Sequence, residues 1–454
     1  ILTPKEMLEG FSNKGMITVA LLFLVSEGIR QSGTLGQVIK KLLPQGKTTV
    51  FKAQLRILPS VAFISAFLNN TPVVVIFAPI IKHWAKSVNL PATKFLIPLS
   101  YVTILGGICT LIGTSTNLVV HGMILEAGFE GFSMFELGKV GIFIAIAGII
   151  YIFLFSKRLL PDARPDTAVP DEEVEEGEKL HRVEAVLGAR FPGINKKLKD
   201  FNFQRHYGAE VKEIKTRNGQ RFVSNLEEVV LHEGDTLVVM ADDTFIPTWG
   251  ESSVFVLLTN GNEPDTTGKK KRWFALLLLV LMIVGATVGE LPITKEMFPD
   301  IKLDMFFFVS ITTIIMAWTN LFPARKYTKY ISWDILITIA CAFAISKAMV
   351  NSGVADSVAK FIIGLSDDYG PHVLLAMVFI ITNLFTELIT NNAAAALAFP
   401  LALSISAQLG VSPTPFFVVI CMAASASFST PIGYQTNLIV QGIGNYKFTD
   451  FVRI

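Results

Sequence analysis

The sequence predicts an all-α polytopic membrane protein with inverted repeats, two re-entrant helical hairpins and two broken helices, plus a small α/β cytosolic domain. Three observations support this fold class. Hydrophobic residues make up 51% of the 454 residues and charged residues only 17%, and the mean hydropathy is +0.53. The motif Gly113-Thr-Ser-Thr-Asn117 returns near the other end of the chain as Gly433-Tyr-Gln-Thr-Asn437. Between the two copies, the composition changes to that of a soluble domain.

Apolar stretches long enough to cross a hydrocarbon layer of about 30 Å define the membrane elements. They occur at 15–33, 95–126, 137–156, 273–292, 304–322, 332–350 and 414–444. Segments 57–87 and 372–406 are also long, but each carries an Asn-Asn pair in its middle. We interpret each as a helical hairpin that enters and leaves on one side, because non-helical backbone at that depth must be covered by protein or face water.

The basic loops set the expected orientation. Four basic groups flank the spans: Lys40, Lys41, Lys47, Lys52 and Arg56; Lys157 and Arg158; Lys269 to Arg272; and Arg325, Lys326 and Lys329. By the positive-inside rule all four are cytoplasmic. Tracing the spans between them makes the first hairpin enter from the cytoplasm and the second from the outside, which inverts one repeat relative to the other. The expected location is the inner (plasma) membrane.

The expected domains are a first membrane repeat at 1–160, a cytosolic linker and domain at 161–268, and a second membrane repeat at 269–454. Two spans of the second repeat, 273–292 and 304–322, have no partner in the first, and the span at 137–156 has none in the second. The repeat pattern therefore predicts two helices before Ile1 and one after Ile454.

The insert begins with a proline-punctuated acidic run that includes Glu172 and Glu178 and is typical of a solvated linker. This linker lets the domain sit away from the membrane. Alternating apolar residues predict a half-buried strand from Ala209 to Ile214, a tight turn at Asn218-Gly219, and a second strand from Thr236 to Met240. The pattern Phe191-Pro-Gly193, Phe201-Asn-Phe203, Tyr207-Gly-Ala209 and Glu233-Gly-Asp-Thr236 resembles the C-terminal lobe of regulators of potassium conductance. That resemblance implies a small-molecule ligand or a purely structural role.

Helix breakers interrupt both copies of the repeated motif. Gly106, Gly107 and Gly113 lie in the first copy, and Pro431 and Gly433 lie in the second. They free backbone amides and carbonyls beside polar side chains. Helix N-termini attract anions, and freed carbonyls and hydroxyls suit a hard cation such as sodium. Neither motif contains Lys or Arg, so neutral donors and neighbouring cations would hold a dianion.

Taken with the hairpin tips Asn69-Asn70-Thr71 and Asn391-Asn392-Ala393, which recur at almost the same interval, these motifs resemble those of the divalent anion/sodium symporters. The resemblance covers most of both repeats. It implies that the tips bind substrate and that the unwound loops join them in holding sodium ions. The implied substrate residues are Asn69, Asn70, Thr71, Asn391, Asn392, Ala393, Gly113 and Gly433. The implied sodium residues are Asn70, Thr110, Gly113, Thr114, Thr116, Asn117, Asn392, Ser429, Thr430, Gly433, Thr436 and Asn437.

Some positions depart from that family. Asn69 and Asn391 stand where the family has Ser, and Ala393 stands where it has Thr, so the second tip lacks a hydroxyl donor. A C4-dicarboxylate substrate therefore does not follow from the resemblance. The Thr-Asn-Leu ending of both broken helices, together with the inserted lobe, resembles the sulfate-type branch of that family, which favours sulfate or a similar small oxyanion over a dicarboxylate or citrate. The resemblance also implies a homodimer in which a transport domain slides against a scaffold in an elevator motion.

Other function classes fit less well. The net charge of +2 indicates no nucleic-acid partner, and the chain lacks a metal cluster, a Gly-x-Ser-x-Gly elbow and a Walker motif, which argues against an enzyme. An arsenite-type exporter of related fold stays open as an alternative, and sodium dependence would separate it from a symporter. A regulated cation transporter is suggested only by the soluble lobe, and the Thr-Val-Gly-Tyr-Gly filter of potassium channels is absent.

Overall fold

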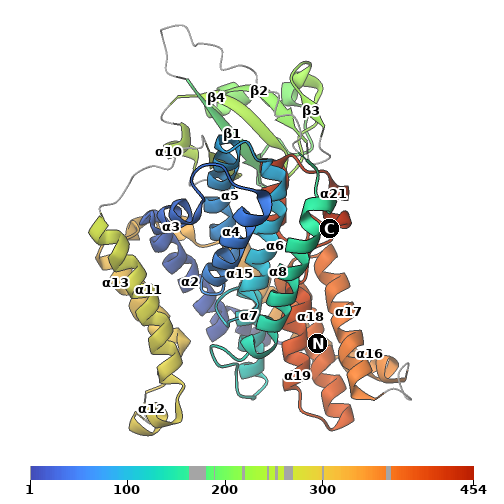
Figure 1. Ribbon diagram of the computed structural model, residues 1–454. Coiled ribbons are helices and arrows are strands. Elements are labelled where there is room, and N and C mark those ends of the chain that lie inside the picture. The colour runs from blue at the N-terminus through green and yellow to red at the C-terminus, as the bar shows by residue number, and fades with distance from the viewer. Residues whose placement is uncertain are drawn as a thin grey trace.

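The computed structural model describes residues 2–162, 180–188, 190–216, 220–242, 245–250, 254–259, 269–298, 301–364 and 370–454. It is mostly helical, with one small sheet at one end of the molecule (Figure 1). Among the described residues, six helices have the length and apolar composition needed to cross a membrane. The acidic linker and the turn expected at Asn218-Gly219 lie outside the described residues.

The first half contains α1 (Pro4–Leu8), α2 (Lys14–Gln31), α3 (Thr34–Leu42), α4 (Val50–Ser65), α5 (Asn70–Ser87), α6 (Leu96–Gly107), α7 (Ser115–Glu126) and α8 (Gly138–Leu159). The expected span at 95–126 is thus two helices separated by a non-helical segment. The segment at 57–87 is likewise the end of α4, a short turn and α5.

The second half contains α11 (Lys269–Gly289), α12 (Pro292–Met297), α13 (Met305–Trp318), α14 (Tyr327–Tyr330), α15 (Trp333–Asn351), α16 (Val354–Gly364), α17 (Pro371–Leu388), α18 (Asn391–Leu409), α19 (Thr414–Ser425), α20 (Gln435–Gly444) and α21 (Phe448–Arg453). The order from α15 to α20 repeats the order from α2 to α7. In Figure 1, α4 and α5 lie in the half of the molecule next to the sheet, whereas α17, α18 and α19 lie in the opposite half.

Four short segments join the paired helices. The first tip (residues 66–69) joins α4 to α5, and the second tip (389–390) joins α17 to α18. The first break (108–114) joins α6 to α7, and the second break (426–434) joins α19 to α20. The two halves interlock at these segments, because α5 packs on α20 and α7 packs on α18.

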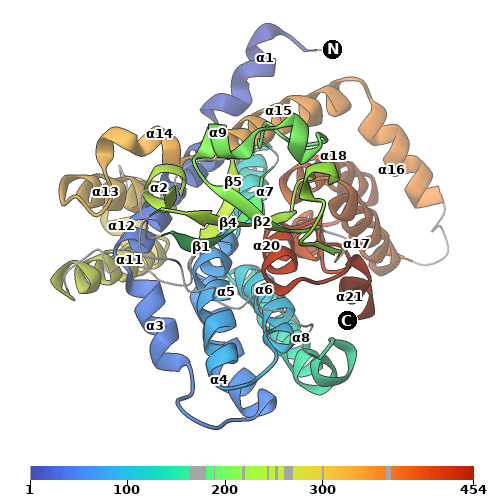
Figure 2. The same cartoon turned by 90° about the horizontal axis from the view of Figure 1, so that it is seen from above.

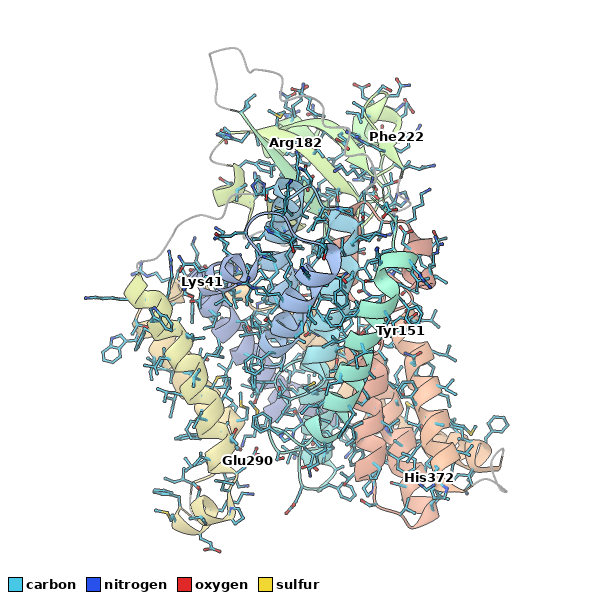
Figure 3. The ribbon with its side chains drawn as sticks, viewed as in Figure 1. Lys41, Tyr151, Arg182, Phe222, Glu290 and His372 are labelled. Carbon is cyan, nitrogen blue, oxygen red and sulfur yellow. The ribbon has the colours of Figure 1, made fainter. Side chains whose placement is uncertain are left out.

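The outer helices carry the apolar surface that a bilayer requires. Phe143 and Leu154 on α8 are 73% and 63% exposed, and Trp273 on α11 is 67% exposed. Tyr151 lies on the same outer helix α8, as Figure 3 shows. Such contiguous exposed apolar faces are stable only against lipid or another protein.

The sheet domain is a five-stranded antiparallel sheet in the order β3-β2-β4-β1-β5. Its strands are β1 (His181–Leu187), β2 (Glu210–Lys215), β3 (Arg221–Phe222), β4 (Thr236–Ala241) and β5 (Phe255–Thr259), and two short helices, α9 (Phe203–Tyr207) and α10 (Phe245–Trp249), accompany it. The two strands expected from alternation are therefore present as β2 and β4. Figure 2 shows the sheet above α5 and α20. This placement corrects the expectation that the domain sits away from the membrane helices.

Candidate substrate and cation site

Four helices begin at the tips and breaks. Helix α5 begins at Asn70 after the first tip, α7 at Ser115 after the first break, α18 at Asn391 after the second tip, and α20 at Gln435 after the second break. Each helix places its first N–H groups, and the positive end of its dipole, at its start. The contacts of α5 with α20 and of α7 with α18 bring these four starts together.

Each tip is closed by a hydroxyl-to-amide contact across the turn. Ser65 Oγ lies 2.8 Å from the Asn70 amide, and Thr386 Oγ1 donates to Asn391 Oδ1 at 2.9 Å. The structural counterpart of Asn70 is therefore Asn391. The pairing of Asn69-Asn70 with Asn391-Asn392 expected from the sequence is shifted by one position, because the second helix begins one position earlier relative to its asparagine pair. Asn392 corresponds to Thr71.

A second asparagine spans each break. Asn117 Nδ2 donates to the carbonyl oxygens of Gly107 at 3.3 Å and Thr110 at 2.9 Å. Asn437 Nδ2 donates to the carbonyl oxygens of Ser427 at 2.9 Å and Thr430 at 3.1 Å. Each amide therefore satisfies two carbonyls that lose their helical partners where the helix stops. This geometry explains why both motifs end in Thr-Asn.

Glycines let each break fold back on its own helix. A Cβ at Gly113 would lie 2.4 Å from the carbonyl oxygen of Gly107, and a Cβ at Gly433 would lie 2.0 Å from Ser427 Oγ. Both distances are shorter than van der Waals contact. Gly113 is therefore required by the close approach of the backbone, and Gly433 by the Ser427 side chain and the Thr386 carbonyl 3.0 Å away. Both glycines reach the site through main-chain atoms only.

Tyr434 connects the two breaks and the start of α5. Its hydroxyl lies 3.1 Å from Thr114 Oγ1 and 2.6 Å from the Asn70 amide. In the amide orientation that suits these neighbours, Asn70 Oδ1 accepts from Tyr434. Its Nδ2, which has two hydrogens to donate, then lies within hydrogen-bond distance of the Ser65, Thr103 and Gly113 oxygens. Thr114 and Tyr434 occupy the same position in the two motifs, so equivalent residues of the two halves touch.

The first turn of the helix after each tip also contacts the first turn of the helix after the break of the other half. Thr71 Oγ1 donates to Gln435 Oε1 at 3.3 Å. In the second half, Asn392 Oδ1 accepts from Ser115 Oγ at 3.3 Å and from Thr116 Oγ1 at 3.1 Å. The two sets of contacts involve equivalent positions, with Thr71 matching Asn392 and Gln435 matching Ser115. The predicted substrate and sodium residues of both halves are thus brought into one network.

The helix starts offer hydrogen-bond donors for an anion. The side chains of the N-cap residues of α5, α7 and α20, which are Asn69, Thr114 and Tyr434, make no capping hydrogen bond. In α18, Thr390 does cap, accepting from Ala393 N at 3.4 Å. Three uncapped helix starts directed at one region form an anion-binding arrangement that needs no Lys or Arg.

Oxygen atoms suited to a cation surround both breaks. Among the described residues, buried oxygens without a hydrogen-bond partner include Asn117 Oδ1 at the first break and Ser425 Oγ and Ser427 Oγ at the second. Thr382 Oγ1 on α17 is a further such atom. A buried oxygen without a partner costs about 1–3 kcal/mol, and a bound hard cation would recover it.

Glu387 makes the second break differ electrostatically from the first. Its carboxylate accepts from Ser429 N at 3.2 Å and from Thr430 Oγ1 at 2.7 Å. In the first half the equivalent hydroxyl, Thr110 Oγ1, donates to the backbone carbonyl of Ala66. No ion pair to Glu387 occurs among the described side chains. The second break therefore carries a formal negative charge where the first has a neutral acceptor.

The remaining sequence-predicted residues fall at the edge of the network or inside it. Asn69 is partly exposed beside it, and Ala393 lies in the first turn of α18, where its N–H bonds Thr390. Ser429 is exposed. Thr436 Oγ1 is buried 2.9 Å from Ser100 Oγ, which also lies 2.6 Å from Asn437 Oδ1.

The two sides of the network differ in cover. Ile112 in the first break is 3% exposed, whereas the equivalent Ile432 is 67% exposed. Ile112 and Asn69 line a small cavity with Ser26 of α2 and Leu279 of α11. Those helices therefore cover the first tip and break, while the described residues leave the second tip and break open.

Sequence reasoning missed several members of the network: Ser65, Ser100, Ser115, Thr386, Tyr434 and Gln435. Tyr434 and Gln435 could have been found, because they align with Thr114 and Ser115 in the repeat. Ser100 carries no such signal, since it lies within an unbroken apolar run of α6.

Comparisons with known proteins agree with a transport role. The sequence model of the citrate transporter family matches residues 1–410 and 297–453. An uncharacterized transporter of Synechocystis is 29% identical over the whole chain and 88% of its own length, and an uncharacterized transporter of Escherichia coli is 24% identical over the whole chain and 90% of its own length. Sodium/sulfate cotransporter 2 of Chlamydomonas reinhardtii is 30% identical over 60% of this chain and 30% of its own length.

The family match covers most of the chain and includes both halves of the network. It confirms the expectations of a multi-pass membrane transporter and of a protein that is not an enzyme. The chain belongs to the citrate transporter family of secondary transporters.

Proposed function

We propose that this protein is a sodium-coupled symporter of a small divalent anion, with sulfate as the favoured substrate. The observation that carries this proposal is the convergence of four helix starts, three of them uncapped, on a network with unpaired buried oxygens. Free N–H groups bind an anion, and free oxygens bind sodium. Asn70, Asn392 and the two breaks belong to both the anion-binding and the cation-binding groups. Binding of one ligand would therefore position atoms that bind the other.

Sulfate suits this donor set. It presents oxygens in all directions and can accept from several helix starts at once, and neutral donors would let it leave again. Ala393 has no side-chain donor, and its backbone N–H already bonds Thr390 Oγ1. This lack of a donor at the second tip disfavours a substrate with two separate carboxylates. The Chlamydomonas relatives named as sodium/sulfate cotransporters support the same choice.

Citrate is the second candidate, because the matching family is described as a citrate transporter family. A dicarboxylate follows it. An arsenite exporter of related fold would transport without sodium, unlike the proposed symporter. A regulated cation transporter would transport without an anion. Substrate competition and ion dependence therefore separate all of these alternatives.

The proposed mechanism is an elevator built on inverted repeats. The transport part would comprise both hairpins (α4–α5, α17–α18) and both broken helices (α6–α7, α19–α20), and α2, α11, α13 and α15 would belong to the scaffold. Each net positive charge moved inward gains about 2.3 kcal/mol per 100 mV of membrane potential. Three sodium ions per dianion would thus couple uptake to both gradients.

Further parts of the proposal concern placement and assembly. We place the protein in the inner (plasma) membrane as a homodimer, with residues 161–268 in the cytoplasm between repeats at 1–160 and 269–454. The basic flanks Lys157-Arg158 and Lys269 to Arg272 support that side. The resemblance of the insert to the C-terminal lobe of regulators of potassium conductance supports a regulatory role.

The test is uptake by proteoliposomes that contain the purified protein. Labelled sulfate, citrate and succinate are offered with an inward sodium gradient, with equal sodium on both sides, and with choline in place of sodium. We expect sulfate uptake only with sodium, and faster uptake with a negative interior. Sodium-independent uptake would contradict the coupling to sodium. Faster uptake of citrate than of sulfate would contradict the choice of substrate.

A further inference from the structure

The sheet domain is attached to α5 by a buried ion cluster. Lys82 Nζ on α5 lies 2.9 and 3.0 Å from the two carboxylate oxygens of Glu184 on β1. Lys215 Nζ on β2 lies 3.3 Å from the same carboxylate. The side chains of Lys82, Glu184 and Lys215 are only 20%, 15% and 3% exposed. Breaking a cluster that is this well buried leaves a charge without a partner, which is costly.

Apolar contacts extend this attachment to α20. Val186 of β1 and Leu257 of β5 belong to the same buried cluster as the membrane helices. A Cβ at Gly234 would lie 2.5 Å from Leu438 on α20, and one at Gly442 would lie 2.6 Å from Thr236 on β4. The two surfaces therefore fit closely, and the domain holds one helix from each half of the site.

A weaker contact joins the domain to α15. Arg190, which follows β1, lies 3.5 Å from Asp334 in the first turn of α15. These side chains are 54% and 63% exposed. Exposed pairs of this kind are screened by salt and contribute little. Helix α15 contains neither a tip nor a break, and it belongs to the proposed scaffold. The Arg190–Asp334 pair therefore joins the sheet domain to the scaffold.

We propose that the sheet domain acts as a brake, by which we mean that it slows the movement of the transport part. The domain moves together with α5 and α20, and in this conformation it is also bound to α15. The inference rests on the elevator motion of the proposed function. When the transport part moves relative to the scaffold, one of the two attachments must open. The Arg190–Asp334 pair opens, because the Lys82–Glu184–Lys215 cluster is buried and supported by apolar contacts. The brake slows one step of the cycle and does not contact substrate.

Reversible cross-linking tests which attachment opens. In a background with Cys109, Cys341 and Cys421 replaced by Ala, one variant carries Arg190→Cys and Asp334→Cys, and the other carries Lys82→Cys and Glu184→Cys. Each is linked by a reducible bis-methanethiosulfonate reagent of matched length and assayed for sulfate uptake before linking, after linking, and after reduction. We expect the link between positions 190 and 334 to stop uptake reversibly, and the link between positions 82 and 184 to leave at least half of it.

The other outcomes overturn the inference. Uptake that survives the 190–334 link means that the domain does not restrain the scaffold. Uptake that is lost with the 82–184 link means that the domain leaves α5 during the cycle. If neither variant takes up sulfate before linking, that result tests the proposed function and not the brake. In that case, the rate at which a maleimide labels Asp334→Cys is compared with and without sodium, and a rate unchanged by sodium contradicts the opening of this contact.

Charge reversal supplies a second measurement without cross-links. Arg190→Glu and Asp334→Arg should each raise the uptake rate about two- to fivefold, since an exposed pair contributes no more than that. The double reversal Arg190→Glu/Asp334→Arg should return the rate to that of the unchanged protein. Single changes without effect, or a double change that only adds their effects, would contradict the brake.

Discussion

Asn70 is the residue with the most connections in the network. Its amide contacts Ser65 in its own hairpin, Thr103 and Gly113 in the neighbouring broken helix, and Tyr434 in the other half. An amide can do this because it both donates and accepts. Asn391 contacts the hydroxyl of its own hairpin in the same way, so the two asparagines are the matched pair for substitution.

We expect Asn70→Ala to reduce sodium-driven sulfate uptake at least tenfold, because its neighbours lose a shared partner at the proposed anion and cation sites. Asn391→Ala and Asn392→Ala should do the same. The measurement is initial uptake rate per unit of purified protein. Tyr434→Phe is the finer change, since it removes only the hydroxyl. Near-normal uptake by all four variants would mean that these side chains do not take part in transport.

Glu387 should control sodium affinity. Glu387→Gln removes the charge beside the second break. Its amide oxygen can still accept from Ser429 N, while its NH2 would donate to Thr430 Oγ1 where the carboxylate accepts. We expect the sodium concentration for half-maximal uptake to rise about tenfold, while sulfate affinity in saturating sodium changes less.

The matched control for Glu387 is Glu27→Gln on α2, because Arg30 and Gln31 of the same helix already occupy the Glu27 carboxylate. This control should leave sodium dependence unaltered. Equal shifts in both variants would mean that the effect of Glu387 is not local.

Sodium dependence should also shift when the oxygens at the breaks change. Thr114→Val, Thr116→Val and Asn117→Ala in the first half, with Thr430→Val, Thr436→Val and Asn437→Ala in the second, should each raise the sodium requirement. Asn117 and Asn437 should have the largest effects, because each also clamps two backbone carbonyls. If none of these variants changes the sodium requirement, the residues serve only to pack the helices and do not bind sodium.

Both helix breaks contain close contacts that leave no room for a side chain at Gly113 or Gly433. Gly433 faces the side chain of Ser427, whereas Gly113 faces the backbone of Gly107. This difference lets one break, and not the other, be repaired by a second substitution.

Gly433→Ala should lower the melting temperature in detergent, because its Cβ would collide with Ser427 Oγ. Gly433→Ala/Ser427→Gly should recover part of the loss, although the Thr386 carbonyl 3.0 Å away still crowds the added methyl. Gly113→Ala has no such rescue, since the atom it meets belongs to the backbone of a residue that is already glycine. Equal melting temperatures for Gly433→Ala and the unchanged protein would contradict the close packing of the second break.

The elements were largely predictable from the sequence, and their contacts were not. Hydropathy located most of the long helices within a few residues, although α4 begins seven residues before the expected segment at 57–87. The repeat located both breaks, because Gly and Pro interrupt apolar runs at equal spacing. The tip register was missed, since two adjacent asparagines in each copy allow two alignments and only the Ser65 and Thr386 contacts decide between them. The docking of the sheet on α5 was also missed, because Lys82 and Glu184 are far apart in the chain and neither carries a recognisable motif.

At the scale of the whole molecule, the sheet domain stabilises the fold while restraining its motion. A variant with residues 165–266 replaced by a short Gly/Ser linker should keep sodium-coupled uptake. Its uptake rate should rise, because the brake is gone, and its melting temperature should fall, because α5 and α20 lose their apolar cover. Both are measured on the same preparation. Complete loss of uptake in a folded, inserted variant would make the domain part of the transport mechanism.

The docking should depend on pH only in strong acid. Burial alone would raise the pKa of Glu184, but the charges of Lys82 and Lys215 lower it to about 2 from 4.5. A depressed pKa contributes stability that is complete above about pH 4.5 and is lost as the pH falls towards 2. The melting-temperature difference between the unchanged protein and Lys82→Met should therefore be constant from pH 8 to pH 5 and shrink below that. A difference that changes between pH 8 and pH 5 would argue against this ion pair.

The contact between Thr114 and Tyr434 has a consequence for the ancestry of the molecule. If the two halves descend from one gene, that gene first encoded a single repeat that assembled as a dimer. The contact then joined one residue to the same residue of the other copy. Any substitution would have altered both sides at once. After fusion each side could change alone, and a hydroxyl on a short side chain could face one on an aromatic ring. The same freedom allowed Glu387 and Ala66 to diverge, so one duplicated cavity could acquire two binding places of unequal charge.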